Sequence, residues 1–122
     1  MALKICLVGH QRSGKTRYAQ SLGVIRAQDF FYKDEYQSTL GVNLEMVTFQ
    51  DTPINLWDIG SLYLGEGIAY TKGAHGILLF HDNKNTPPPF RIPPGIPVVD
   101  VFPNQNGENP MNNLLNLINV TM

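Results

Sequence analysis

The sequence contains a single cysteine, Cys6, so it offers no intramolecular disulfide, a usage typical of a reducing compartment. It has no run of 18 apolar residues and no signal-peptide core, which argues against membrane spanning and secretion. No cysteine stands among the last four residues, where a prenylated tail would need one, so we expect no direct membrane anchor. Together these scarcities predict a cytoplasmic protein.

Charge is scarce as well. Asp, Glu, Lys and Arg make up 16% of the residues, and the formal net charge is -1. Proteins that bind nucleic acid or anionic membranes through their charge carry a clear basic excess. We therefore expect neither nucleic acid nor a charged membrane surface as a partner.

Apolar runs and turn residues predict one α/β domain over residues 1–122. Strands are expected at residues 3–8, 43–49, 54–57, 76–80 and 96–102, and helices at 15–22, around 62–72 and at 110–120. Turn residues at 50–53 join two of the strands as a hairpin. Five prolines within residues 85–95 exclude a helix there. The pattern predicts a mainly parallel sheet with one antiparallel hairpin strand.

Residues 9–16 read GHQRSGKT and fit the pattern G-x-x-x-x-G-K-[ST]; we call them the GKT loop. The pattern is meaningful only where the loop leaves a buried strand and opens a helix, and both are predicted here. Gly9 and Gly14 permit close approach of the backbone to a ligand. Successive amides and the start of the following helix then form a cradle for anions.

Several residues of the GKT loop have expected roles in this cradle. Arg12 and Ser13 lie within it, and Lys15 is placed to reach terminal phosphates as the first catalytic candidate. The Thr16 hydroxyl is a candidate ligand for Mg²⁺. The sequence thus predicts binding of a nucleoside phosphate with Mg²⁺, as kinases, ATPases and GTPases all achieve with such a loop.

Three residues beyond the loop extend this prediction. Asp58 follows the apolar strand 54–57 and is a candidate for the Mg²⁺ shell, and Gly60 can offer its amide to a terminal phosphate. Thr39 can add a hydroxyl to the same metal. Plain structural alternatives remain open, namely a helix-capping Asp58 and a solvated Thr39.

Three further segments resemble Rab-type small GTPases, members of the Ras superfamily. Residues 38–44, STLGVNL, are similar to the switch I stretch STIGVDF of that family. Residues 56–60, LWDIG, resemble WDTAG one residue short, and residues 70–77, YTKGAHGI, resemble YYRGAHGI almost throughout. With the GKT loop, four ordered matches cover about residues 3–82. The resemblance implies a P-loop G-domain fold.

The resemblance also implies roles for individual residues. Thr39 matches the switch threonine that senses γ-phosphate and Mg²⁺, and Tyr36 matches an aromatic that lies over the phosphates. Tyr32 occupies the place of an aromatic that packs against the base. The implied ligands are GTP or GDP with Mg²⁺, and the implied partners are Rab effectors, exchange factors and GTPase-activating proteins.

The chain departs from the family at the catalytic and base-reading positions. Ser61, the second catalytic candidate, stands where the family has a water-orienting Gln. The family motif NKxD is replaced by residues 103–106, PNQN, which leaves Asn104 and Asn106 as the base-side candidates. The last strand and one helix of the family are also missing, so we expect a truncated G-domain, a reduction that a compact viral genome would favour. Slow hydrolysis and weak discrimination among bases follow.

Other conspicuous residues are expected to be structural. We expect His75 to pack, Trp57 to belong to the core or a partner surface, and His81 and Asp82 to be solvated at the end of strand 76–80. Three functions stay in competition: a slow Rab-like GTPase, a nucleotide-binding pseudo-GTPase that mimics the Rab surface, and a P-loop ATPase or nucleotide kinase with relaxed specificity.

Overall fold

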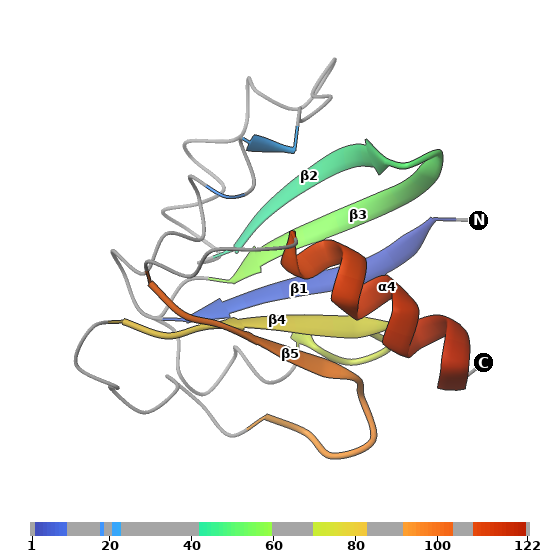
Figure 1. Ribbon diagram of the computed structural model, residues 1–122. Helices are drawn as coiled ribbons and strands as arrows, with labels where there is room; N and C mark the ends of the chain where they lie inside the picture. The colour runs from blue at the N-terminus through green and yellow to red at the C-terminus, as the bar shows by residue number, and fades with distance from the viewer. Residues whose placement is uncertain are drawn as a thin grey trace.

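The computed structural model describes residues 2–9, 18, 21–22, 42–59, 70–82, 92–103 and 109–121. Within these residues five strands form one sheet (Figure 1). They are β1 Leu3–Gly9, β2 Val42–Phe49, β3 Thr52–Ile59, β4 Gly76–Phe80 and β5 Val98–Val101, followed by helix α4 Pro110–Thr121. The order across the sheet is β2-β3-β1-β4-β5. Only β2 runs antiparallel to its neighbour, so the predicted sheet type is confirmed.

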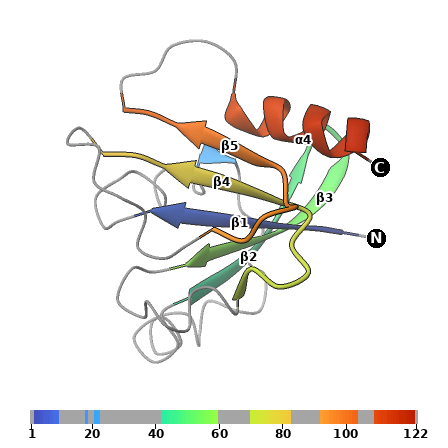
Figure 2. The ribbon, with the colours of Figure 1, turned by 90° about the horizontal axis from the view of Figure 1, so that it is seen from below.

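β1 is the central strand because its apolar residues are buried on both faces of the sheet, as a parallel inner strand requires. Ile5 and Leu7 point toward the face that α4 covers, and Cys6 and Val8 toward the other. Figure 2 shows the strands β1, β4 and β5 ending at the same edge of the sheet, away from the N-terminus. A loop that leaves β1 therefore begins in the middle of this carboxyl edge.

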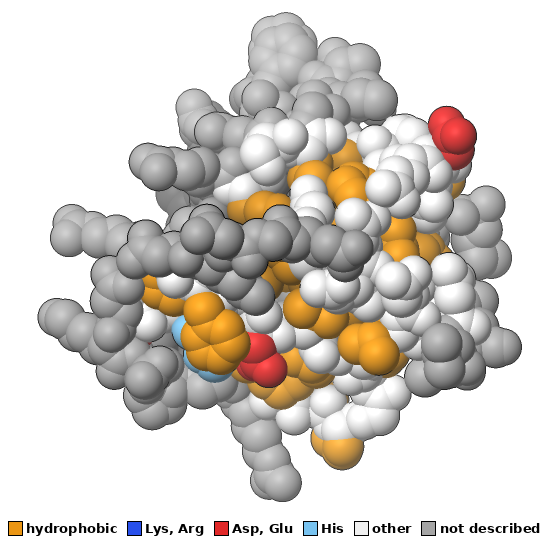
Figure 3. All heavy atoms as spheres, viewed as in Figure 1, with side chains coloured by type: hydrophobic (Ala, Val, Ile, Leu, Met, Phe, Trp, Pro, Cys, Tyr) orange, Lys and Arg blue, Asp and Glu red, His pale blue; other side chains and the backbone are white. Residues whose placement is uncertain are grey.

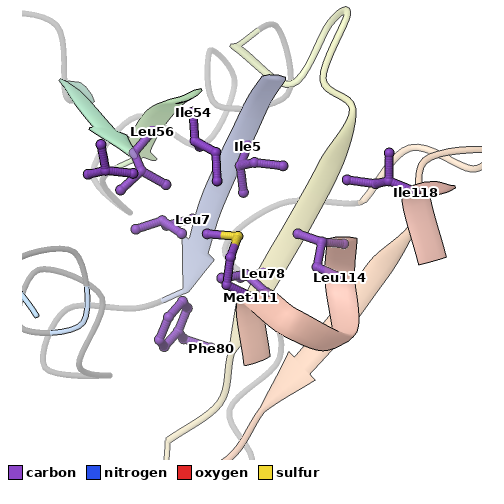
Figure 4. Packing of buried hydrophobic residues seen from close by; sticks show 10 residues of the cluster. Ile5, Leu7, Ile54, Leu56, Leu78, Phe80, Met111, Leu114 and Ile118 are labelled. Carbon is purple, nitrogen blue, oxygen red and sulfur yellow. The ribbon is translucent and has the colours of Figure 1, made fainter. Parts of the chain in front are cut away.

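α4 packs on one face through a stripe of apolar residues at helical spacing. Met111, Leu114 and Ile118 are buried against Ile5 and Leu78, and Figure 4 shows these side chains pointing toward one another. Gly76 permits the close approach, since a Cβ built there would lie only 2.8 Å from Leu114 Cδ1. The helix predicted at 110–120 is thus confirmed, and it covers β4 and β5.

The structure corrects the predicted hairpin turn and the ends of two predicted strands. The hairpin turn is only Gln50 and Asp51, because β3 already begins at Thr52 and includes Pro53. Pairing of β3 with β1 starts at Ile54, so no bond to β1 is lost at the proline. β5 is shorter than residues 96–102. Its pairing with β4 begins at Val98, after Pro97, whose carbonyl accepts from Ile77 N at 2.9 Å.

Of the helix expected around 62–72, only residues 70–72 lie in the described part of the chain. Tyr70 is helical, and Thr71, Lys72 and Gly73 form a turn. Gly73 has a φ of 75°, a left-handed conformation that commonly closes a helix. None of the helices in the described part of the chain has the length and apolar character needed to span a bilayer.

Candidate functional site

The GKT loop begins at the end of the central strand. Gly9 is the last residue of β1, and it lies beside Phe80, the last residue of β4. The buried strand that the loop pattern requires is therefore present, with residues 5–9 all buried. In open α/β sheets ligands bind outside the carboxyl ends of the strands, where the chain switches direction across the sheet. β1 is such a point, because β3 and β4 flank it on opposite sides.

Asp58 is a buried carboxylate at the same edge, on the strand next to β1. Its side chain is 8% exposed, and its Cα pairs in register with Leu7, two residues before Gly9. Asp58 is the penultimate residue of β3 rather than the residue after the strand, because β3 extends to Ile59. Since it lies inside a strand, Asp58 is not the N-cap of a helix. A buried carboxylate oxygen here fits the ligand preference of Mg²⁺.

The ends of β4 and β5 carry an aromatic and acidic cluster that the sequence did not reveal. His81 Nε2 lies 2.8 Å from Asp100 Oδ1, and the His81 ring stacks on Phe102 with centroids 4.6 Å apart and planes 11° apart. Figure 3, viewed as Figure 1, shows a histidine, a hydrophobic side chain and a carboxylate close together at the surface. His81 is therefore not simply a solvated residue, as its position at a strand end had predicted.

The chain is similar to solved structures but matches no known sequence family. No protein-family model matches the sequence, and no curated protein gives a significant sequence match. A chain of the T. brucei IFT22/74/81 GTP-bound crystal structure is similar with a TM-score of 0.56 and 16% identity, over 99% of this chain and 96% of that chain. The G domain of the T. maritima FeoB iron transporter is similar with a TM-score of 0.51 and 18% identity, over 98% of each chain.

The chain has the fold of a GTPase G domain. This confirms the fold that the four sequence matches implied, including its one antiparallel strand. At such low identity the likeness establishes the G-domain fold, and the residues themselves have to carry any argument about function.

Within this G-domain fold, most predicted site residues lie outside the described part of the chain. They are Arg12, Ser13, Gly14, Lys15, Thr16, Tyr32, Tyr36, Thr39, Gly60, Ser61, Asn104 and Asn106, and their roles stay predictions. Gly9 and Asp58 are the two that the structure places, and it brings both to neighbouring strands at one edge. No group of three or more His, Cys, Asp or Glu in the described ranges could hold a metal ion.

Tyr18 connects the segment after the GKT loop with α4, a contact that sequence reasoning missed. Its hydroxyl donates to Asn109 Oδ1, and its ring packs 5.6 Å from the Phe80 ring at a tilt of 58°. Burial raises the pKa of Tyr18 to about 12. The partners are 91 residues apart in sequence, so no local pattern could have indicated the bond.

The opposite, amino end of the sheet has structural contacts. His75 Nδ1 accepts from Lys4 N at 2.9 Å, and His75 N donates to the Lys4 carbonyl at 2.8 Å, in line with its expected packing role. The Lys4 ammonium lies 4.0 Å from the centre of the Trp57 ring, and that ring packs against the buried cluster around Cys6. Trp57 thus belongs with the core, as expected.

Proposed function

We propose that the protein is a Rab-like small GTPase that binds GTP and GDP with Mg²⁺ at the GKT loop and hydrolyses GTP slowly. In this proposal it acts in the cytoplasm as a switch or mimic in membrane-traffic signalling. The observation that carries it is the position of Gly9 at the end of the central strand, with the buried Asp58 on the next strand. The G-domain fold supports it, and one structural neighbour is GTP-bound.

The proposed binding reaction rests on electrostatics at the carboxyl edge. Lys15 would neutralise terminal phosphates, while Thr16, Thr39 and Asp58 would supply oxygen atoms to Mg²⁺. Gly60, two residues after Asp58, would donate its amide to the γ-phosphate once that phosphate is present. When bound, Mg²⁺ would neutralise charge that develops on the transferred phosphoryl group.

Two measurements test nucleotide binding. The first identifies GDP, GTP, ATP or no nucleotide released when the purified protein is denatured. The second compares Lys15→Ala with Lys72→Ala, an exposed lysine in the turn before β4 at the other end of the sheet. Lys15→Ala should remove most of the affinity for labelled GTP because a charge-assisted contact is lost, and Lys72→Ala should not. Equal binding by all three proteins, or none by the wild type, would contradict the proposal.

Turnover should be slow because Ser61 is too short to orient an attacking water as Gln does. We expect single-turnover hydrolysis no faster than the order of 10⁻⁴ per second of unassisted Ras. No internal arginine finger is evident from the sequence, although Arg12 lies within the GKT loop. A rate near that of a partner-stimulated GTPase, measured without any partner, would refute the assignment.

The second candidate is a pseudo-GTPase that binds nucleotide and presents a Rab-like surface to effectors, exchange factors or activating proteins without useful turnover. Ser61 and the uncharged Asn106 favour it, because neither catalytic Gln nor the guanine-reading carboxylate is present. Asn106 also predicts weak base selection. A preference for GTP over ATP above about a thousandfold, or some 4 kcal/mol, would show that another residue reads guanine.

A further inference from the structure

The His81 and Phe102 rings lie one residue beyond a row of paired residues at the carboxyl edge. Gly9 of β1 pairs with Phe80 of β4, and Phe80 pairs with Val101 of β5. His81 follows Phe80, and its amide donates to the Val101 carbonyl at 2.8 Å, which continues the pairing past the strand ends. Neighbouring strands are ~4.8 Å apart, so the row from Gly9 to Val101 spans roughly 10 Å.

This span suits a nucleotide whose phosphates lie at the GKT loop. The base of a nucleoside phosphate is separated from its β-phosphate by the ribose and the α-phosphate, a distance comparable with two strand spacings. A nucleotide anchored just beyond Gly9 can therefore place its base either over β3 and β2 or over β4 and β5.

The chemistry of the two sides differs. On the β3 side the described residues present Asp58, a buried carboxylate that suits a metal ion and repels the uncompensated charge of phosphates. On the β4 and β5 side they present stacked rings. Phe102 is 46% exposed, whereas the His81 side chain beneath it is 20% exposed, so Phe102 is the outer ring of the pair. A flat aromatic surface suits a nucleobase.

Asp100 helps to hold this surface in place. Its carboxylate lies 2.8 Å from His81 Nε2, which fixes the plane of the imidazole ring and hence of the Phe102 ring stacked on it. Asp100 is in β5 and His81 immediately follows β4, so the platform is attached to two paired strands.

We propose that Phe102, supported by His81 and positioned by Asp100, is the stacking platform for the base of the nucleotide held at the GKT loop. This inference rests on the proposed nucleotide binding and adds the residues that take the base. An aromatic face stacks on any base, because every base has a π-face. The platform therefore contributes affinity without selecting guanine, in keeping with the uncharged residues that replace the family's base-reading motif.

The test distinguishes the contribution of the base to binding affinity from the contribution of the phosphates. Calorimetry measures binding of GTP, ATP and inorganic tripolyphosphate, each with Mg²⁺, to the wild type and to Phe102→Ala. We expect Phe102→Ala to weaken GTP and ATP alike by about tenfold, and to leave tripolyphosphate unchanged. Leu117→Ala is the matched control, since it truncates a hydrophobic side chain of α4 that is 42% exposed. Lys15→Ala should weaken all three ligands.

A second variant reports contact directly and keeps the platform. Phe102→Trp should retain the affinity for ATP, and its added fluorescence, relative to the wild type with Trp57 alone, should be quenched by saturating ATP but not by tripolyphosphate. Unchanged GTP and ATP affinities in Phe102→Ala, or unquenched fluorescence in Phe102→Trp at saturating ATP, would overturn the platform alone. Failure of all three ligands to bind the wild type would instead overturn the proposed function.

Discussion

A single side-chain oxygen of Asn109 serves two parts of the chain. Asn109 Oδ1 accepts from the Tyr18 hydroxyl and from Met111 N, the latter at 3.0 Å. The Asn109 carbonyl accepts from Asn112 N at 2.9 Å, and Pro110 follows as the first residue of α4. This is the geometry of an N-cap, with proline at the position that needs no amide proton. Asn109 therefore starts α4 and holds Tyr18 at the same time.

Asn109→Ala should lower the free energy of unfolding by about 2 kcal/mol. The lost cap accounts for about 1 kcal/mol and the unsatisfied Tyr18 hydroxyl for a similar amount. Urea denaturation measures the change, with Asn113→Ala on the exposed side of the same helix as the control. Similar, small effects of the two substitutions would show that the Asn109 bonds contribute nothing to stability.

Asp58 is the described residue best placed to act on a metal, and the conservative variant Asp58→Asn removes its charge while keeping its shape. We expect it to reduce the gain in nucleotide affinity on adding Mg²⁺ by about tenfold or more, since a charge-assisted contact is lost. Titrations in Mg²⁺ and in EDTA measure this gain. Asp51→Asn, at an exposed turn residue of the hairpin, is the control. The same Mg²⁺ dependence in both variants would remove Asp58 from the metal site.

At the scale of elements, the β2–β3 hairpin has a strained turn. Gln50 and Asp51 both have positive φ, 49° and 64°, between the paired residues Phe49 and Thr52. Two-residue hairpin turns with two positive φ angles favour Asn-Gly, because most side chains resist the left-handed region.

Replacing both residues, Gln50→Asn with Asp51→Gly, should therefore raise the free energy of unfolding by about 1 kcal/mol. Thermal denaturation checks this, and Asp51→Ala, which keeps a Cβ in the left-handed region, should bring no gain. The hairpin turn lies at the opposite end of β3 from Asp58, so nucleotide affinity should not change. A gain from Asp51→Ala as large as that from the double variant would mean that the turn angles do not limit stability.

The elements themselves were largely predictable from sequence. Buried runs predicted β1 and β4 because inner parallel strands are apolar on both faces, and the spacing of Met111, Leu114 and Ile118 predicted α4. The predicted strand ends were wrong near prolines, because whether a strand can include a proline depends on how the adjacent strand pairs with it. Pro53 is accepted in β3 because β1 begins only opposite Ile54, and that register is a tertiary property that the local composition does not contain.

The site was predictable where a motif fixes the backbone and not where distant segments meet. The GKT loop pattern required a buried strand before Gly9, and Asp58 was expected beside that strand; the structure has both features. The contacts of His81 with Asp100 and Phe102 join two strands across 19 and 21 positions of sequence. Such contacts follow from the pairing of β4 and β5, so the spacing of residues within either strand does not predict them.

At the scale of the whole molecule, burial couples stability to alkaline pH. It raises the pKa of Cys6 from its ordinary 9.0 to about 12, partly offset by the Lys4 charge, and that of Tyr18 from 10.0 to about 12. Between the ordinary pKa and the raised pKa of each group, the unfolded chain has lost a proton that the folded protein still holds. Stability is therefore fully present below pH 9 and falls as the pH rises toward 12.

We expect each group to contribute a slope of up to about 1.4 kcal/mol per pH unit within its window. Urea denaturation at pH 7 to about pH 11 measures the slope. Cys6→Ala should be less stable at pH 7 because it loses buried volume, yet its stability should fall less between pH 9 and 11. An identical slope in the wild type and Cys6→Ala would show that the thiol does not drive the alkaline loss.

The only thiol in the chain lies at the centre of the sheet, and the rate of its chemical modification can report how often the packing around it opens. Cys6 is 0% exposed, is held between Trp57 of β3 and Ile77 of β4, and donates to the Tyr70 carbonyl at 3.7 Å. The Cys6 side chain lies on the sheet face opposite α4, under residues that include Tyr70, so a thiol-modifying reagent reaches it only when the packing of that face opens, and the labelling rate reports this opening. Because β1 leads directly into the GKT loop, a ligand bound at that loop should lower the rate at which Cys6 is modified. A ligand bound elsewhere on the surface should leave that rate unchanged.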